Sequence, residues 1–265
     1  MNPADEQATP GDLDLGPDFP HEQILGISFF HGTAADAIAE INRVGGLLVC
    51  PAATALVKLR HDEDYRRALQ QADLVLADSN LLALLWKIAT GRTLRNVSGL
   101  SYLKGLLNDT TFRDSHATFW IVSSLRAKQR AMEWLRGREL IIDPQNVWAV
   151  ESGKDYPLLQ EIETRRPEHV VIATGAGQEK LGLYFRDYLL YRPKIHCVGA
   201  ALGFLTGDER PIPEWAERFH LGWLFRFVAQ PGMIVPRLGI ACVLAGMVMK
   251  YRNQLPPLKN RWADI

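Results

Sequence analysis

The sequence has few cysteines and lacks the common motifs of a metal or nucleophile site. Its three cysteines, Cys50, Cys197 and Cys242, lie far apart and form no C-x-x-C pair, so we expect small buried thiols in a reducing compartment. The seven histidines form no H-E-x-x-H pattern, and no G-x-S-x-G nucleophile elbow is present. The sequence therefore gives no reason to expect a bound metal.

Long apolar runs and net charge are lacking as well. The longest uncharged stretch near the C-terminus runs from Leu238 to Met249, whereas a helix that spans a membrane needs about 20 apolar residues. No basic segment followed by an apolar one marks a secretory signal. We therefore expect a protein that is cytosolic or lies on a membrane face. Its 30 basic and 30 acidic residues balance, which argues against a general nucleic-acid binder.

The two ends of the chain differ in charge. Residues 1–42 contain no Lys or Arg, whereas the stretch from Arg218 to Trp262 contains seven basic residues and no acidic one. A separation of this kind predicts that the C-terminal end meets an anionic partner.

The order of the expected elements predicts an α/β fold. Apolar, β-branched runs alternate with helical segments, which is typical of a Rossmann-like, mostly parallel sheet flanked by crossover helices. We expect strands at residues 47–50, 72–77, 118–122, 147–150, 170–174 and 195–198. We expect helices at residues 33–44, 54–71, 80–90, 101–107, 127–136, 158–165 and 178–190.

The composition divides the chain into three parts. Residues 1–22 are rich in Pro, Gly and acidic residues and are expected to be disordered. Residues 23–207 form the α/β domain. Residues 208–265 form a basic, aromatic helical appendage, which could lie in a membrane interface over anionic lipid, pack on the core with its arginines extended into water, or form an oligomer interface.

The glycine-rich segment 174–180 follows a predicted strand and opens a predicted helix. Gly175 and Gly177 would allow a tight turn whose N–H groups face an anion, typically a phosphate. Lys180 stands where a dinucleotide fingerprint has its third glycine, and residues 194–201 offer no acidic partner for a ribose. These departures count against a nucleotide-dependent oxidoreductase. A tight turn without a ligand is the structural alternative.

Three polar residues are candidates for chemistry at the same sheet edge. Asp78 ends the predicted strand at residues 72–77, and ligands of open parallel sheets bind outside the carboxyl ends of the strands. A carboxylate there can act as a general base, although Asp78 could instead cap the helix that begins near Asn80. Gln178 and Glu179 could bind a sugar-like ligand, whereas Glu179 also suits the positive end of a helix.

Four blocks, in this order and at this spacing, resemble the WecG/TagA/CpsF family of bacterial glycosyltransferases, and the resemblance runs from about Leu25 to Arg237. Residues 72–78 are similar to a family strand that ends in Asp-Gly. Residues 97–103 are similar to its Thr-Gly-x-Asp-Leu block, and residues 170–180 to its strand followed by Gly-x-Pro-x-Gln-Glu-Lys. Residues 210–237 are similar to its Arg-Ala-Pro, Glu-Trp-x-x-Arg, Glu-Pro and Arg series.

The resemblance implies a transferase that moves a hexosyl or N-acetylhexosaminyl group from a UDP-sugar to a polyprenyl-diphosphate-linked acceptor. The reaction would invert the anomeric centre, need no metal or other cofactor, and serve exopolysaccharide or surface-polysaccharide synthesis. The protein would sit on the cytoplasmic face of the membrane, in contact with its anionic surface, and could form homo-oligomers. Nucleic acid is not expected as a partner.

The resemblance also assigns roles to single residues. Asp78 matches the general base of the family, and the arginines at 226 and 237 would close over the diphosphate. The candidate substrate-binding residues are Ser98, Gly99, Arg95, Gly175, Gly177, Gln178, Glu179, Arg210, Arg226 and Arg237.

Several positions depart from the family pattern. Ser79 replaces the glycine after the aspartate, Ala52 lies where a polar Thr-x-Asn block is expected, and Gly177 replaces a proline. Gly203 replaces an aspartate and Gly222 a glutamate. In addition, an arginine of the family falls on Asn96. These changes indicate a divergent branch, and they leave a second hypothesis open, that of a non-catalytic member that binds lipid-linked intermediates or partner enzymes.

Overall fold

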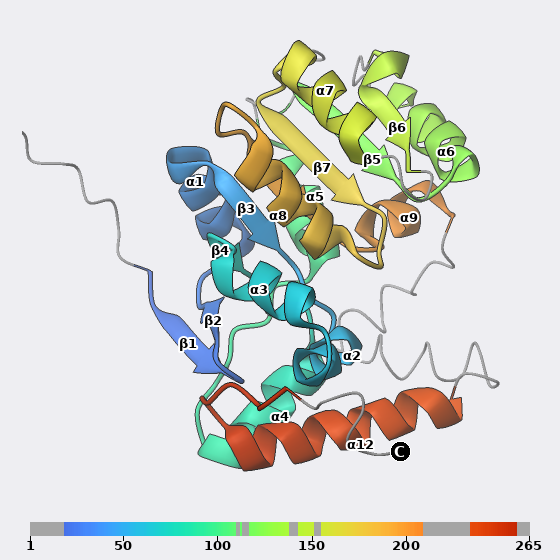
Figure 1. Cartoon of the computed structure of the whole chain (residues 1–265). Coiled ribbons are helices and arrows are strands. Elements are labelled where there is room, and N and C mark those ends of the chain that lie inside the picture. The colour runs from blue at the N-terminus through green and yellow to red at the C-terminus, as the bar shows by residue number, and fades with distance from the viewer. Residues whose placement is uncertain are drawn as a thin grey trace, which may run out of the picture.

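The structure is a computed structural model, which describes residues 19–109, 112, 117–137, 143–150, 155–208 and 234–258. Its centre is a six-stranded sheet in the order β4-β3-β8-β7-β5-β6, in which every neighbouring pair is parallel (Figure 1). The strands are β3 (Gly46–Val49), β4 (Leu74–Val75), β5 (Thr118–Val122), β6 (Val147–Ala149), β7 (His169–Ala173) and β8 (Lys194–Cys197). The predicted α/β class with a parallel sheet is therefore confirmed.

Helices cover both faces of the sheet, because successive residues of each strand point to opposite sides. One core cluster joins the sheet to α3 (Glu63–Gln71), α7 (Asp155–Arg165) and α8 (Gln178–Tyr188). The other joins it to α1 (Ala34–Val44), α5 (Gly99–Leu106), α6 (Leu125–Arg136) and α9 (Ala201–Thr206). This double cover explains why the strand sequences are almost continuously apolar.

The predicted helix at residues 54–71 is wrong as a single element. It is divided into α2 (Ala53–Leu56), the 3₁₀ helix η1 (Val57–Arg60) and α3. The break occurs at Asp62, whose carboxylate accepts the N–H of Tyr65 at 3.0 Å and so caps a new helix. A second short 3₁₀ helix, η3 (Pro144–Asn146), precedes β6.

A hairpin that the sequence analysis did not predict precedes the sheet. Strands β1 (His21–Ile24) and β2 (Ile27–Phe30) pair in antiparallel fashion through a turn at Leu25 and Gly26, both with positive φ, as hairpin turns of two residues require. The turn also contacts the C-terminal part of the chain, because the N–H groups of Leu25 and Gly26 donate to the carbonyls of Arg252 (2.7 Å) and Asn253 (3.1 Å).

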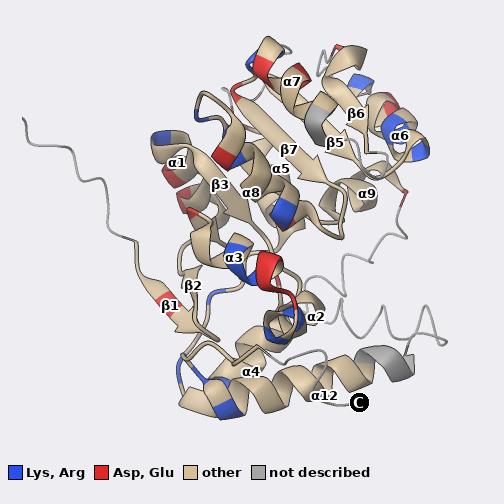
Figure 2. Ribbon diagram, in the orientation of Figure 1, with Lys and Arg blue, Asp and Glu red and all other residues tan. Residues whose placement is uncertain are grey.

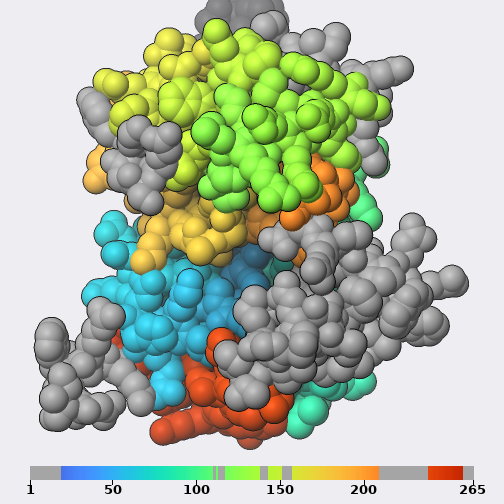
Figure 3. All heavy atoms as spheres, turned by 90° about the vertical axis from the view of Figure 1, so that its right-hand side faces the viewer, coloured from blue at the N-terminus to red at the C-terminus, as the bar shows by residue number. Residues whose placement is uncertain are grey.

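One helix of the expected appendage is described, and it packs on the α/β domain. Helix α12 (Ile234–Tyr251) contacts α2, η1 and α4 (Asn80–Thr90), and its Leu244, Met247 and Val248 are buried in the first core cluster. Figure 2 shows no acidic residue on α4 or α12. In the space-filling view of Figure 3, α12 lies at one end of the molecule and α6 towards the other. The remaining appendage residues 209–233 and 259–265 lie outside the described residues.

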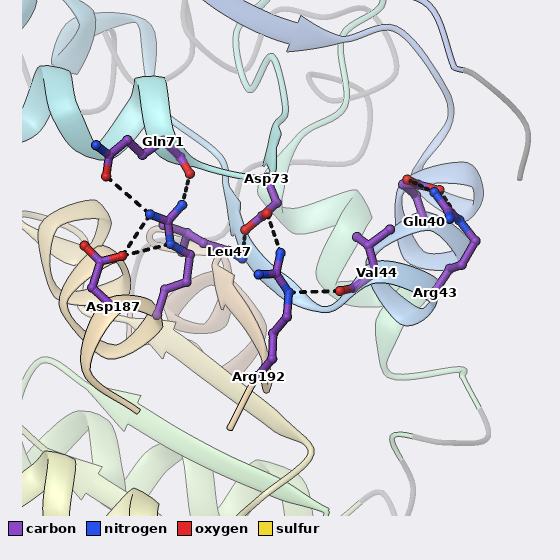
Figure 4. A network of polar contacts seen from close by, with 9 residues as sticks. Glu40, Arg43, Val44, Leu47, Gln71, Asp73, Asp187 and Arg192 are labelled. Carbon is purple, nitrogen blue, oxygen red and sulfur yellow. Dashed lines mark hydrogen bonds and ion pairs between the residues drawn. The ribbon is translucent and has the colours of Figure 1, made fainter. Parts of the chain in front are cut away.

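The amino ends of β3 and β4 are joined by the polar network of Figure 4. The Asp73 carboxylate accepts the N–H of Leu47 at 2.7 Å and a guanidinium N–H of Arg192 at 2.6 Å, and Arg192 also donates to the carbonyl of Val44 at 3.0 Å. Gly46 has φ of 95°, and a Cβ there would lie 2.3 Å from Asp73 Oδ2. Side chains thus fill this edge, and the loops that could receive a ligand gather at the opposite, carboxyl edge.

Candidate active site

The carboxyl edge of the sheet brings together the two segments that the sequence analysis singled out. Asp78 follows β4, and the glycine turn at residues 174–177 follows β7. Strands β3 and β8 lie between β4 and β7, so that the two segments are separated by three strand spacings, or about 14 Å.

Asp78 is not the cap of α4, and the capping alternative for it is wrong. The N-cap is Ser79, whose hydroxyl accepts the N–H of Leu82 at 3.2 Å. Asn96 fixes this turn, because its Oδ1 accepts the Ser79 N–H at 2.9 Å and its Nδ2 donates to Asn80 Oδ1 at 2.6 Å. Two departures from the family pattern, Ser79 and Asn96, therefore have structural roles in this turn, and the N-cap of α4 is Ser79 and not Asp78.

The first turn of α5 lies against Asp78. Ser98 is the N-cap of this helix, and its hydroxyl accepts the N–H of Ser101 at 3.0 Å. Gly99 is buried, and a Cβ there would lie 2.8 Å from the carbonyl oxygen of Val198 and 3.4 Å from Asp78 Oδ2. The absence of a side chain at Gly99 thus permits this close approach. The positive end of a helix near a carboxylate favours the negative charge that a general base carries.

Gln178 and Glu179 are both buried at the start of α8. The Gln178 Oε1 accepts the N–H of Gly199 at 2.8 Å, and its main-chain carbonyl accepts the Sγ–H of Cys197 at 3.3 Å. Gln178 therefore joins α8 to the loop after β8.

Burial raises the pKa of Glu179, and this effect exceeds the opposing hydrogen bonds from its own N–H and from Gln178 and the charges of Lys58 and Lys180. Burial also raises the pKa of the Cys50 thiol, with the carboxylates of Asp78 and Glu179 acting in the same direction. Cys50 follows β3. Both carboxylates therefore lie near the carboxyl end of β3, and the Cys50 thiol stays protonated.

The glycine turn faces open space. Gly175 and Gly177 have φ of 76° and 79°, and a Cβ at either position would meet no atom within 4 Å. Their backbone conformation, and not a close contact, is what favours glycine here. Lys180, in place of a third glycine, forms an ion pair with Asp62 at 2.8 Å and so links α8 to the start of α3.

A pocket opens beside this turn, between β5, β7, α6 and α9. Its lining residues are mostly small: Val122, Ser123, Ala127, Ala173, Thr174, Gly175, Ala200, Leu202, Gly203, Thr206 and Asp208. Asp208 pairs with Arg126 at 3.4 Å and Arg130 at 3.7 Å. Gly203, which replaces an aspartate of the family, is thus part of the lining, and Asp208 supplies a different carboxylate to this pocket.

Of the arginines among the predicted site residues, the structure describes the side chain of Arg95 alone. Arg95 is exposed and close to Asp36 in the first turn of α1, where hydrogen bonds from Thr33 and then the charge of Arg95 lower the pKa of Asp36. Arg210 and Arg226 lie outside the described residues, and only the backbone of Arg237, in α12, is described.

The sequence analysis missed several residues of this edge. The charge of Lys58 acts on Glu179, and Gly199 donates its N–H to Gln178, because η1 and the loop after β8 lie near α8 in space. Asp208 reaches the pocket in the same way. Gly199 has φ of 66°, and a glycine directly after a predicted strand was the one local signal that could have pointed to this loop.

No three His, Cys, Asp or Glu side chains in the described part of the chain gather as they would around a metal ion. Among the helices that the structure describes, none combines the length and the hydropathy needed to cross a membrane.

Comparison with protein-family models matches residues 22–257 to the glycosyl transferase WecG/TagA/CpsF family. The match covers most of the chain, including Asp78, the glycine turn and α12. It extends beyond Arg237, where the resemblance was expected to end. A comparison with curated proteins found no significant match.

Proposed function

The chain belongs to the WecG/TagA/CpsF family of glycosyltransferases, and we propose that it moves a hexosyl or N-acetylhexosaminyl group from a UDP-sugar to a polyprenyl-diphosphate-linked acceptor. The family implies a glycosyltransferase of cell-surface polysaccharide synthesis, with a sugar donor and an acceptor. The observation that carries the proposal is the place of Asp78 at the carboxyl edge of the sheet, beside the first turn of α5, while Ser79 caps α4.

The proposed reaction is a single displacement with inversion, without a metal ion in its chemistry. The Asp78 carboxylate accepts the proton of an acceptor hydroxyl. The oxygen of that hydroxyl forms a bond to the anomeric carbon as the bond from this carbon to the diphosphate oxygen breaks. The electron pair of the broken bond leaves with UDP, and the new glycosidic bond lies on the opposite face of the sugar.

Stabilisation of the leaving diphosphate is assigned to the glycine turn and the start of α8. The turn faces open space, and the N–H groups at the beginning of an 11-residue helix attract phosphate oxygens. Arg210, Arg226 and Arg237 remain candidates for the same charge. Gln178 and Glu179 are proposed to act by shaping this loop, because both are buried at the start of α8 and Gln178 accepts the N–H of Gly199.

The proposed location is the cytoplasmic face of the membrane, where the lipid-linked acceptor is found. The support is the basic C-terminal end of the chain and the apolar helix α12.

A panel of UDP-sugars offered with a polyprenyl-diphosphate acceptor tests the proposal, with UDP release and the anomeric configuration of the product as readouts. We expect one UDP-sugar to be consumed only when acceptor is present, and the product to have the inverted configuration. Binding of a UDP-sugar without transfer to any acceptor would instead support the non-catalytic alternative, which the loss of polar side chains at Ala52 and Gly203 favours.

A further inference from the structure

Three fully buried polar side chains join helix α5 to the sheet. The hydroxyl of Tyr102 lies 2.8 Å from His196 Nδ1, and His196 Nε2 lies 3.1 Å from His169 Nδ1. Tyr102 belongs to α5, His196 to β8 and His169 to β7. These hydrogen bonds therefore tie the helix that lies beside Asp78 to the two central strands of the sheet.

The protons of these hydrogen bonds have a favoured arrangement. Burial lowers the pKa of His169 and of His196, so each imidazole is neutral and carries a single N–H. Glu168 Oε1 lies 4.0 Å from His169 Nε2, and a carboxylate at this end favours the N–H on Nε2. With that assignment, His169 Nδ1 accepts from His196 Nε2–H, and His196 Nδ1 accepts from the Tyr102 hydroxyl. Tyr102 is thus the donor that holds α5.

The segment that leads into α5 holds the backbone on both sides of Asp78. The N–H of Val97 donates to the carbonyl of Ala77 at 3.1 Å, and Asn96 Oδ1 accepts the N–H of Ser79 at 2.9 Å. Helix α5 begins within two residues of this segment. A shift of α5 would therefore displace the residues directly before and after Asp78.

Two contacts fix the first turn of α5 against β8 and the loop that follows it. At the start of the helix, Gly99 lies so close to the carbonyl oxygen of Val198 that a Cβ would be only 2.8 Å from it. In the same turn, the N–H of Tyr102 donates to the carbonyl of Ser98 at 2.9 Å, and its side chain reaches His196. A hydrogen bond has a preferred direction, whereas apolar packing has none. The bond from Tyr102 therefore limits sliding of α5 in a way that the surrounding apolar contacts do not.

We propose that Tyr102 and His196 are positioning residues for Asp78. Their hydrogen bond fixes α5 on β8, α5 fixes the segment on both sides of Asp78, and His169 orients the His196 ring from β7. Both side chains are fully buried and act through this segment without contact with a substrate. A general base must lie within hydrogen-bond reach of the acceptor hydroxyl, and a misplacement of about 1 Å can lower a rate about a hundredfold. The inference rests on the proposed function of Asp78.

The variant Tyr102→Phe tests the proposal, because it removes one hydroxyl and keeps the ring. With the UDP-sugar and acceptor that the wild type uses, we expect kcat to fall at least about tenfold, while KM for the UDP-sugar stays within about twofold. The control is Tyr191→Phe, whose hydroxyl donates to the carbonyl of Pro167 at 2.9 Å, at the amino edge of the sheet. It also loses one hydrogen bond and should keep the kcat of the wild type. A kcat of Tyr102→Phe equal to that of the wild type overturns the inference.

A double variant separates positioning of Asp78 from any other effect of Tyr102. If Tyr102 acts through Asp78, the change Tyr102→Phe should alter the residual transfer by Asp78→Asn by less than about twofold. A loss of the same size with and without the Asp78 carboxylate would show that Tyr102 acts elsewhere, and the inference would be wrong.

Two substitutions of His196 distinguish its two hydrogen bonds. An Asn side chain places its amide near the position of Nδ1, whereas a Gln side chain places it near that of Nε2. His196→Asn should therefore keep the bond to Tyr102 and retain more transfer than His196→Gln, which keeps the bond to His169. Equal transfer by the two variants, or the reverse order, contradicts the inference.

Amide hydrogen exchange tests the inference without a transfer reaction. In Tyr102→Phe, residues 77–83 and 96–102 should exchange at least about tenfold faster than in the wild type, whereas residues 63–71 of α3 should exchange at the same rate. Tyr191→Phe should leave all three segments unchanged. Equal exchange of residues 77–83 and 96–102 in Tyr102→Phe and the wild type overturns the inference. If the wild type transfers sugar to no acceptor, the proposed function fails, and this comparison still decides whether Tyr102 holds the segment around Asp78.

Discussion

Single contacts at the carboxyl edge determine where its charged groups lie. Gln178 is buried, and its Oε1 accepts the N–H of Gly199, so this side chain holds the loop after β8 against α8. Gly99 has no Cβ, and this absence lets the start of α5 approach Val198 and Asp78 closely. The geometry around the proposed general base therefore depends on residues that carry no charge.

The variant Gly99→Ala tests this close approach. Its Cβ would lie 2.8 Å from the Val198 carbonyl oxygen, so α5 or the loop after β8 must move, and we expect a loss of about 1–3 kcal/mol in the free energy of unfolding. Urea unfolding measures it. The control is Gly239→Ala, where a Cβ meets nothing within 4 Å and the free energy of unfolding should stay equal or rise. Equal values for Gly99→Ala and the wild type would contradict the packing argument.

At the scale of elements, local signals predicted most helices and strands. Strand β5 (residues 118–122) and helix α4 (residues 80–90, closed by Gly91) match their predictions residue for residue. The wrong or missing predictions concern elements whose bounds depend on contacts between distant segments of the chain. Asp62 ends one helix and starts another, and the β1–β2 turn is held by carbonyls more than 200 positions away in the chain. The sequence could place Asp78 at the end of a strand, but it could not predict that Ser79, and not Asp78, caps α4.

A chain of three buried polar side chains links α5, β8 and β7. The hydroxyl of Tyr102 lies 2.8 Å from His196 Nδ1, and His196 Nε2 lies 3.1 Å from His169 Nδ1. Burial lowers the pKa of His169 to about 4 and that of His196 well below its usual value, and each is lowered further by nearby positive charge. Both imidazoles are therefore neutral in the folded protein at pH 7.

These shifts predict a loss of stability in mild acid. The pKa of both histidines is lower in the folded state than the value near 6.5 of an unfolded chain, so the unfolded chain binds more protons below that pH. The stability that the two neutral histidines contribute is present above about pH 6.5 and is lost as the pH falls from there towards 4. Between pH 7 and pH 5 we expect the free energy of unfolding to drop by about 2 kcal/mol for each histidine.

Urea unfolding at several pH values measures this drop. The variant His169→Gln should lose the part of the pH dependence of unfolding that His169 contributes. The variant His61→Gln changes an exposed position and should keep the full pH dependence. A pH dependence that is the same in all three proteins would contradict the assignment to His169.

At the scale of the whole molecule, the described part of the appendage is a component of the fold. Leu244, Met247 and Val248 complete a core cluster that also holds residues of the sheet, and the segment after α12 binds the β1–β2 hairpin and Arg66. The sequence predicted the α/β class, yet not the strand order or this packing, because both depend on which distant faces meet. A truncation after Gly207 would therefore remove core contacts together with any docking surface, which makes point variants the better tests.

Leu244→Ala measures the contribution of α12 to the fold. Leu244 is fully buried, and its truncation should lower the free energy of unfolding by about 2–4 kcal/mol. Leu238→Ala, on the exposed side of the same helix, should change it by less than about 0.5 kcal/mol. If the two variants lose the same stability, α12 does not pack on the domain as described.

The central claim, that Asp78 is the base of a sugar transfer, is tested most directly by the rate of Asp78→Asn. The variant keeps the shape of the side chain and loses its proton acceptor. With the UDP-sugar and acceptor that the wild type uses, we expect transfer to fall at least about a hundredfold, while the affinity for the UDP-sugar and the unfolding midpoint stay unchanged. Turnover close to that of the wild type would contradict the claim.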